Sequence, residues 1–161
     1  MSAGWRWHVK IKCEVERFTA TKWATAEDKA KGLSALVSFV EAGFPESKFT
    51  RRIYEALYLH MLGHIAHYDQ AGFFREWFST PERQLRWLQY VAKGGAYGIG
   101  GSGDPTSTWS DVETALVEWV RASGLMHRYE GIVEGRTRSR ELAQLAYLEA
   151  KYGDRASTQA A

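Results

Sequence analysis

Three histidines are the residues whose types and spacing come closest to a reactive site. His60, His64 and His67 are four and three positions apart, so on a continuous helix their imidazoles would lie along one stripe. Neutral imidazole is a common protein ligand for zinc and also suits iron and copper. The pattern therefore makes a divalent metal the candidate cofactor, with Asp69 or His127 as further ligands that folding would bring in.

The same three histidines also have a packing interpretation. Ile53 and Leu57 continue their stripe toward the N-terminus, so the imidazoles would lie at the edge of a buried helix face. The helix carries no HExxH motif, and three collinear histidines do not close a tetrahedral metal site by themselves. Metal binding and core packing both remain open from the sequence.

A glycine-rich segment over residues 94–108 contains a second motif. Gly98, Gly100 and Gly103 match GxGxxG, in which glycines let a backbone approach a pyrophosphate. A dinucleotide fold needs a strand before these glycines and a helix directly after them, whereas a helix precedes this segment and the next helix begins several residues later. We predict instead a loop that becomes ordered against a partner, with Tyr97 and the three glycines as contact residues.

An alternating run at the N-terminus predicts a half-buried β-strand. From residue 5 to residue 16, apolar side chains occupy the odd positions and polar side chains the even positions. A strand has backbone donors and acceptors that must be paired. We expect this strand to pair at an edge, with residues 17–23, or with the same strand of a second copy.

A homodimer through this strand would align opposite charges. In an antiparallel pair centred on Ile11, Arg6 faces Glu16 and His8 faces Glu14. A two-stranded ribbon followed by helices resembles, in outline, the ribbon-helix-helix repressors over roughly the first 70 residues. The resemblance implies that the outward strand residues would contact DNA, and these are Arg6, His8, Lys10 and Lys12.

The elements that would position these groups are predicted to be helices. Capping residues and apolar spacing place helices over residues 26–42, 51–68, 73–78, 81–93, 110–123, 125–133 and 137–152. The predicted fold is mostly α, a single-domain bundle of six or seven helices with the N-terminal strand. Residues 1–24 form the strand and an extended segment, residues 25–153 the helical domain, and residues 154–161 a frayed tail.

Two groups of arginines have alternative interpretations. Arg51 and Arg52 lie near a helix start, where their charges slightly oppose the helix dipole. Either they bind a ligand there, or they have no function at this position. Arg136, Arg138 and Arg140 are interspersed with glutamates, which favours a solvated helix face.

Composition limits the class of protein. The chain has 161 residues, 45% of them hydrophobic, and 21 Lys and Arg against 19 Asp and Glu give a net charge of +2. No stretch reaches the roughly 18 apolar residues of a membrane span, and the first residues are charged where a secretory signal is apolar. The single Cys13 is consistent with a reducing compartment, so we expect a cytoplasmic protein.

These observations favour binding over catalysis. Seven Trp, eight Tyr and seven Phe indicate a dense core or a substantial partner surface, and no catalytic set is assembled. We predict a small non-catalytic protein that acts through protein-protein or nucleic-acid contacts, including self-association, with the strand and the glycine-rich loop as its contact surface. The alternative is a metal-binding protein or metal-dependent enzyme that uses the three histidines. A third hypothesis is a structural or assembly subunit.

Overall fold

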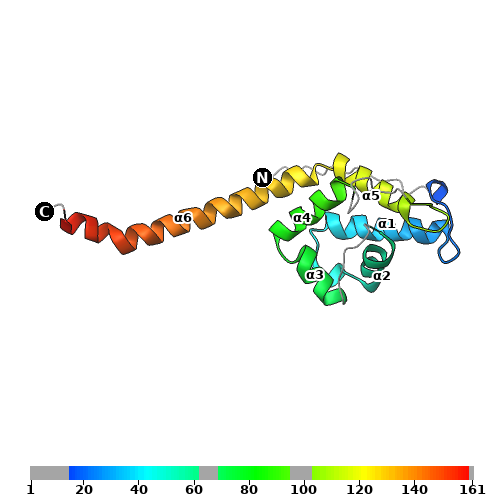
Figure 1. Ribbon diagram of the computed structural model, residues 1–161, viewed down its shortest axis with the longest axis horizontal. Coiled ribbons are helices and arrows are strands. Elements are labelled where there is room, and N and C mark those ends of the chain that lie inside the picture. Colours follow the sequence, from blue (N-terminus) through cyan, green and yellow to red (C-terminus); the bar gives the residue numbers. More distant parts are fainter. Residues whose placement is uncertain (1–14, 62–68, 95–102, 160–161) are drawn as a thin grey trace, which may run out of the picture.

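The protein is mostly helical, as predicted. A computed structural model describes residues 15–61, 69–94 and 103–159, and within these ranges it contains six α-helices and no strand. The elements in chain order are η1 Val15–Arg17, α1 Ala26–Glu41, η2 Glu46–Lys48, α2 Arg51–Glu55, η3 Ala56–His60, α3 Gln70–Phe78, α4 Pro81–Ala92, α5 Ser110–Ala122 and α6 Leu125–Gln159. Helices α1 to α5 form a head, and α6 leaves it as a long projection (Figure 1).

Side-chain caps set several of the helix starts. Thr25 accepts a hydrogen bond from the backbone N–H of Asp28, and the Asp28 carboxylate accepts one from the N–H of Thr25, which forms a capping box for α1. Thr80 caps α4 in front of Pro81. Helix α1 ends where Gly43 takes φ of +89°, a conformation that glycine adopts without strain.

Aromatic packing forms the core of the head. All seven phenylalanines are buried, and Phe39, Phe44 and Phe78 pack against one another with ring centroids 5.1 to 5.5 Å apart. Trp87 from α4 and Tyr129 from the start of α6 close this cluster against Phe44. Much of the high aromatic content therefore stabilises the core through burial and edge contacts.

The described part of the N-terminal region differs from the predicted strand. Residues 15–17 form a 3₁₀ turn, and residues 18–25 form a loop without strand pairing, so the predicted pairing with residues 17–23 is wrong. Phe18 is buried in the core, because its aromatic ring gains more from packing there than from an edge strand. The alternating run over residues 5–14, including Cys13, lies outside the described residues.

Several predicted helices have different bounds in the structure, including the one over residues 73–78, which begins at Gln70. The predicted helix over residues 51–68 ends at His60, because a π-helical turn over Ala56–His60 is followed by Met61 in an extended conformation. The two pieces predicted for residues 125–133 and 137–152 are one continuous helix. That helix continues to Gln159, through most of the tail that was expected to be frayed.

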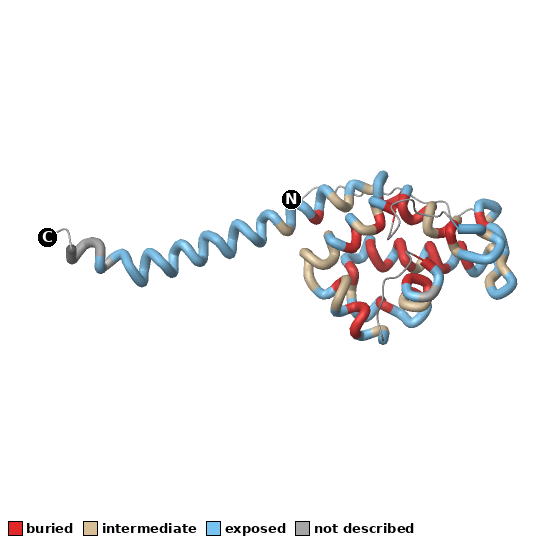
Figure 2. Tube along the Cα trace, in the orientation of Figure 1, coloured by how far each residue is buried: buried red, intermediate tan, exposed pale blue. Residues whose placement is uncertain are grey.

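Helix α6 contacts the head through its first half. It packs mainly on α4 and also on α5, and Arg136 and Arg140 form ion pairs with Glu82 at the start of α4. In its second half, residues 142–153 are all exposed (Figure 2). None of the helices in the described part of the chain is long and apolar enough to cross a membrane.

Candidate binding groove

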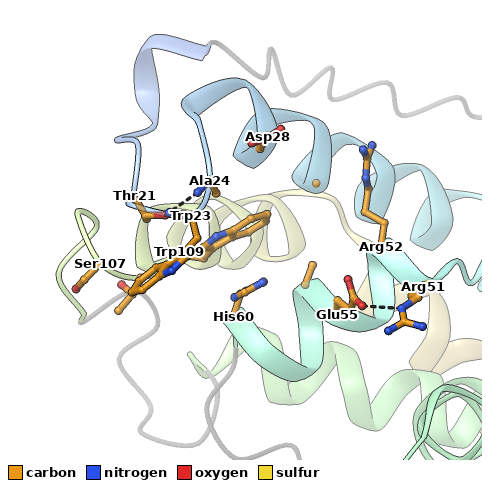
Figure 3. A pocket seen from close by; sticks show the side chains of 13 residues that line it. Thr21, Trp23, Ala24, Asp28, Arg51, Arg52, Glu55, His60, Ser107 and Trp109 are labelled. Carbon is orange, nitrogen blue, oxygen red and sulfur yellow. Dashed lines mark hydrogen bonds and ion pairs between the residues drawn. The ribbon is translucent and has the colours of Figure 1, made fainter.

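A groove of about 590 Å³ lies on one side of the head (Figure 3). It is lined by α1, the loop before α1, helices α2 and η3, and the segment that precedes α5. One end is aromatic, with Trp23, Trp109 and His60, and the other end carries Arg51 and Arg52. The lining therefore comes from three stretches of sequence that folding brings together.

A stacked pair of rings forms the inner wall at the aromatic end. The imidazole of His60 lies parallel to the indole of Trp109, with ring centroids 5.0 Å apart and planes inclined by 15°. Loss of hydration beside Trp109 lowers the pKa of His60 below its ordinary value, although the residue stays exposed on its outer side. The shift favours the neutral imidazole, which presents a mostly apolar face.

Gly32 permits this position of the Trp109 ring. A Cβ on Gly32 would lie 2.8 Å from Cζ3 of Trp109, closer than carbon atoms approach without a shift. The glycine is buried in the middle of α1, where it reduces helix propensity by about 0.5 to 1 kcal/mol relative to alanine. Its position is explained by the close approach of the indole.

Trp23 stands at the rim with most of its indole in solvent. Its side chain is 78% exposed, in contrast to the fully buried Trp87. The backbone beneath it is ordered, because the Thr21 hydroxyl accepts hydrogen bonds from the N–H groups of Trp23 and Ala24. A fixed loop therefore holds a large apolar ring in water beside a groove.

The charges around the groove are balanced. Arg51 donates to Glu55 at 2.7 Å across one helical turn, while Asp28 is held in the capping box of α1. Arg52 forms no ion pair with the described residues. Two arginines and two carboxylates thus line the same opening, without an excess of either sign.

A buried lysine behind the groove anchors its walls. Lys29 on α1 is fully buried, and its ammonium donates at 2.9 Å to the carbonyls of Pro105 and Thr108 and to the carboxylate of Asp111. Asp111 also accepts a hydrogen bond from the backbone N–H of Thr19. One ion pair therefore fixes both the segment before α5 and the loop before α1.

The role of this lysine was not predicted, although the sequence contains a signal for it. Lys29 lies four residues before Leu33 and seven before Leu36, on the face of α1 that the apolar spacing predicts to be buried. A charged residue on a buried face requires a partner. Asp111 is 82 residues away in sequence, so spacing alone does not identify it.

The histidine stripe is not formed on one continuous helix. His60 ends η3 and lies in the groove, the next residue is extended, and His64 and His67 lie outside the described residues. Asp69 caps α3 through a hydrogen bond from Gly72, and His127 is exposed on α6. Among the described residues, no three His, Cys, Asp or Glu side chains are grouped so as to hold a metal ion.

Most of the other predicted contact residues lie outside the described ranges. These are Arg6, His8, Lys10, Lys12, Tyr97, Gly98 and Gly100. Gly103 is described and exposed, and its carbonyl accepts a hydrogen bond from the hydroxyl of Ser110. It does not line the groove, whereas Ser107, Thr108 and Trp109 do.

Comparison with models of protein families, with curated proteins and with solved structures found no match for this chain. A fold alone would not fix a function, because one architecture serves many activities. The chemistry of the groove is therefore the basis for a functional proposal. Stacked and exposed rings with flanking charges are suited to hold an apolar or planar group, and the described lining residues assemble no nucleophile with a base.

Proposed function

We propose that the protein is a non-catalytic binding protein that takes an apolar or aromatic side chain of a protein partner into this groove. The supporting observation is the exposure of Trp23, 78% of whose side chain faces solvent on an ordered loop. Tryptophan is enriched among the residues that carry most of the free energy of protein-protein binding. A partner side chain that entered between Trp23 and the stack of His60 and Trp109 would remove three rings from water.

The balance of charge favours a protein partner over a nucleic acid. Binding to a phosphate backbone draws on an excess of Lys and Arg, whose contacts release counterions. The groove offers Arg51 and Arg52, but Asp28 and Glu55 offset them, and Arg51 is already paired with Glu55. A peptide segment with an apolar anchor and charges of both signs would complement such a rim.

The test is a selection of peptides on the full-length protein from a random twelve-residue display library. We expect enriched peptides to share an aromatic or large aliphatic anchor. Trp23→Ala should weaken their binding at least tenfold, since an anchor residue contributes 2 kcal/mol or more. Because Trp23 is exposed, the variant should keep the thermal stability of the wild type.

Tyr147→Ala is the matched control for this selection. Tyr147 is an aromatic side chain, 61% exposed, in the second half of α6, a helix that does not line the groove. Its loss should leave peptide affinity unchanged. A library that yields no binder, or peptides that bind Trp23→Ala as tightly as the wild type, would contradict the proposal.

The competing proposal is nucleic-acid binding through Arg6, His8, Lys10 and Lys12. It includes a homodimer that forms through the same N-terminal strand. Single-stranded and double-stranded oligonucleotides are the probes. Affinity through these residues would fall steeply with salt and would be lost in Lys10→Glu/Lys12→Glu. Anchor-dependent peptide binding through Trp23 would instead change little with salt.

Metal binding is the second alternative. Of the three histidines His60, His64 and His67, His60 is the one that lies within the described residues. Its neutral imidazole, at a groove wall, has the protonation state that a metal ligand needs. Elemental analysis of protein purified without chelator should find stoichiometric zinc, iron or manganese if this proposal is correct, and His64→Ala should remove the metal.

We place the protein in the cytoplasm on the ground of its single Cys13.

A further inference from the structure

The second half of α6 carries an apolar surface that the head does not cover. Leu142 is 57% exposed, Leu145 52% and Tyr152 46%. The last ion pair between α6 and the head is made by Arg140, and the helix continues beyond it to Gln159 (Figure 2). An isolated helix has little stability in water, since most helical stability in proteins comes from packing. These residues therefore require a partner.

The exposed residues follow a heptad spacing. Gly135, Leu142 and Glu149 are seven residues apart, and Arg138, Leu145 and Tyr152 form the second heptad series three positions later. With 3.6 residues per turn, the two series share one face of the helix.

That face is directed away from the head. Tyr129, which is buried in the core, and Arg136 and Arg140, which pair with Glu82, lie on the opposite side of α6. A second helix can therefore lie along this face of α6 without a clash with the head to which that α6 belongs.

We propose that this face binds the same face of a second copy, and that the two α6 helices pair in an antiparallel coiled coil. In one antiparallel register, Leu142 packs on the partner's Leu145 and Arg138 meets the partner's Glu149. The same register places Gly135, which has no side chain, opposite the partner's Tyr152. Each contact occurs twice because the pair has two-fold symmetry.

The flanking positions support the same register. Glu134 would lie beside the partner's Arg155, so the outer pair also has opposite charges. On the other flank, the small residues Ser139 and Ala146 face each other and allow the helices to approach closely. None of Arg138, Glu149 and Glu134 forms an ion pair within the described part of its own chain.

The alternative helix pairings are unfavourable. A parallel coiled coil in register would place Arg138 against Arg138 and Glu149 against Glu149, with like charges buried at two layers. A shift of the antiparallel register by one heptad toward the C-terminus places Leu145 against the partner's Glu149. A shift of one heptad toward the N-terminus places Leu142 against the partner's Arg138. Only the proposed register matches apolar with apolar and positive with negative.

Charge reversal and rescue, followed by sedimentation equilibrium of the full-length protein, test this pairing. The wild type should form a dimer below about 100 μM, and Arg138→Glu and Glu149→Arg should each raise the dissociation constant at least tenfold, through about 1.4 kcal/mol or more. The double variant Arg138→Glu/Glu149→Arg should restore the dimer, since it exchanges the two charges. Glu130→Arg, a charge reversal at an exposed position of the same helix outside the two heptad series, is the matched control and should leave the dissociation constant unchanged.

Three outcomes would overturn the proposal. The wild type could remain a monomer at 100 μM, the single reversals could leave association unchanged, or the double variant could dimerise no better than either single variant. All the substituted side chains are exposed, so each variant should keep the circular dichroism of the folded head. The groove lies on the head, so the result is independent of the proposed peptide binding.

Discussion

At the scale of single residues, Lys29 has the largest effect on the groove. Its ammonium is fully buried and bonds to two carbonyls and to Asp111, whose side chain is itself only 14% exposed. Removing the lysine would leave both carbonyls without this donor and would leave the Asp111 carboxylate without its cation, with only backbone N–H donors remaining. The anchor therefore contributes stability and also the placement of Trp109.

Lys29→Met tests this role. Removing one member of a buried ion pair lowers the free energy of unfolding by about 3 to 5 kcal/mol. Urea denaturation of the variant should show a loss of this size, whereas Lys31→Met, at an exposed position of the same helix, should change stability by less than about 0.5 kcal/mol. A loss below about 1 kcal/mol for Lys29→Met would show that the pair is not an anchor.

His60 gives a pH dependence whose sign follows from its burial. Its pKa is lowered in the folded protein, so the unfolded chain binds the proton more strongly. The stability that the neutral His60 contributes is fully present above the ordinary histidine pKa. It is lost as the pH falls through the lowered pKa of His60 in the folded protein. His60→Gln should therefore lose less stability than the wild type between pH 7 and pH 5, in paired denaturation curves. An NMR titration that gave His60 a pKa above its ordinary value would reverse this expectation.

At the scale of elements, the structure shows which helices can be predicted from local sequence. The helices predicted over residues 26–42, 81–93 and 110–123 agree with α1, α4 and α5 to within one residue at each end. Thr25 and Thr80 cap the starts of α1 and α4, and Gly43 and Gly124 follow the ends of α1 and α5. Each of these ends depends on a side chain or a backbone conformation within a few residues. Local chemistry is therefore sufficient for them.

Other helix bounds depend on tertiary contacts and were not predicted. Apolar periodicity over residues 51–68 does not reveal the π-helical turn before the extended Met61. In α6, a break was expected between residues 133 and 137, but the helix continues through Gly135, which a helix tolerates at a cost of about 1 kcal/mol when its neighbours pack. Arg136 and Arg140 supply such contacts through Glu82, which lies 54 and 58 residues away.

Gly32→Ala tests the fit between α1 and the groove. Alanine favours the helix, but its Cβ would lie 2.8 Å from the Trp109 ring, so the indole must shift from its present position beside His60. We expect a shift of the Trp109 indole resonance and at least tenfold weaker binding of the selected peptides. Overpacking should lower stability by no more than about 2 kcal/mol.

Ser34→Ala, at an exposed position of α1, is the control for this substitution. It should leave both the indole resonance and the peptide affinity unchanged. If Gly32→Ala binds the peptides as the wild type does, the Trp109 wall is not part of the site.

At the scale of the whole molecule, the site was less predictable than the fold. The groove combines residues 21–32, 51–60 and 107–109, and no local pattern joins them. Arg51 and Arg52 were noted from the sequence as a ligand site or as residues without a function, and both line the groove. Trp23 was interpreted as part of an extended run, because its exposure depends on the loop that α1 and Asp111 hold in place.

The two proposals place two different contacts on one molecule. The groove would bind a peptide segment of another protein, and the projecting α6 would join two copies through its outward face. In such a dimer the two heads would stand at opposite ends of the paired helices, since the pairing is antiparallel. One dimer would then offer two grooves to a partner with repeated segments, which increases the effective affinity.

The measurement that tests the groove most directly is an NMR titration of the seven tryptophan indole N–H groups with one selected peptide. If the peptide binds in the groove, the resonances of Trp23 and Trp109 should shift in a saturable way with the same dissociation constant, while that of the buried Trp87 should not. Saturable shifts confined to other tryptophans, with Trp23 and Trp109 unchanged, would contradict it.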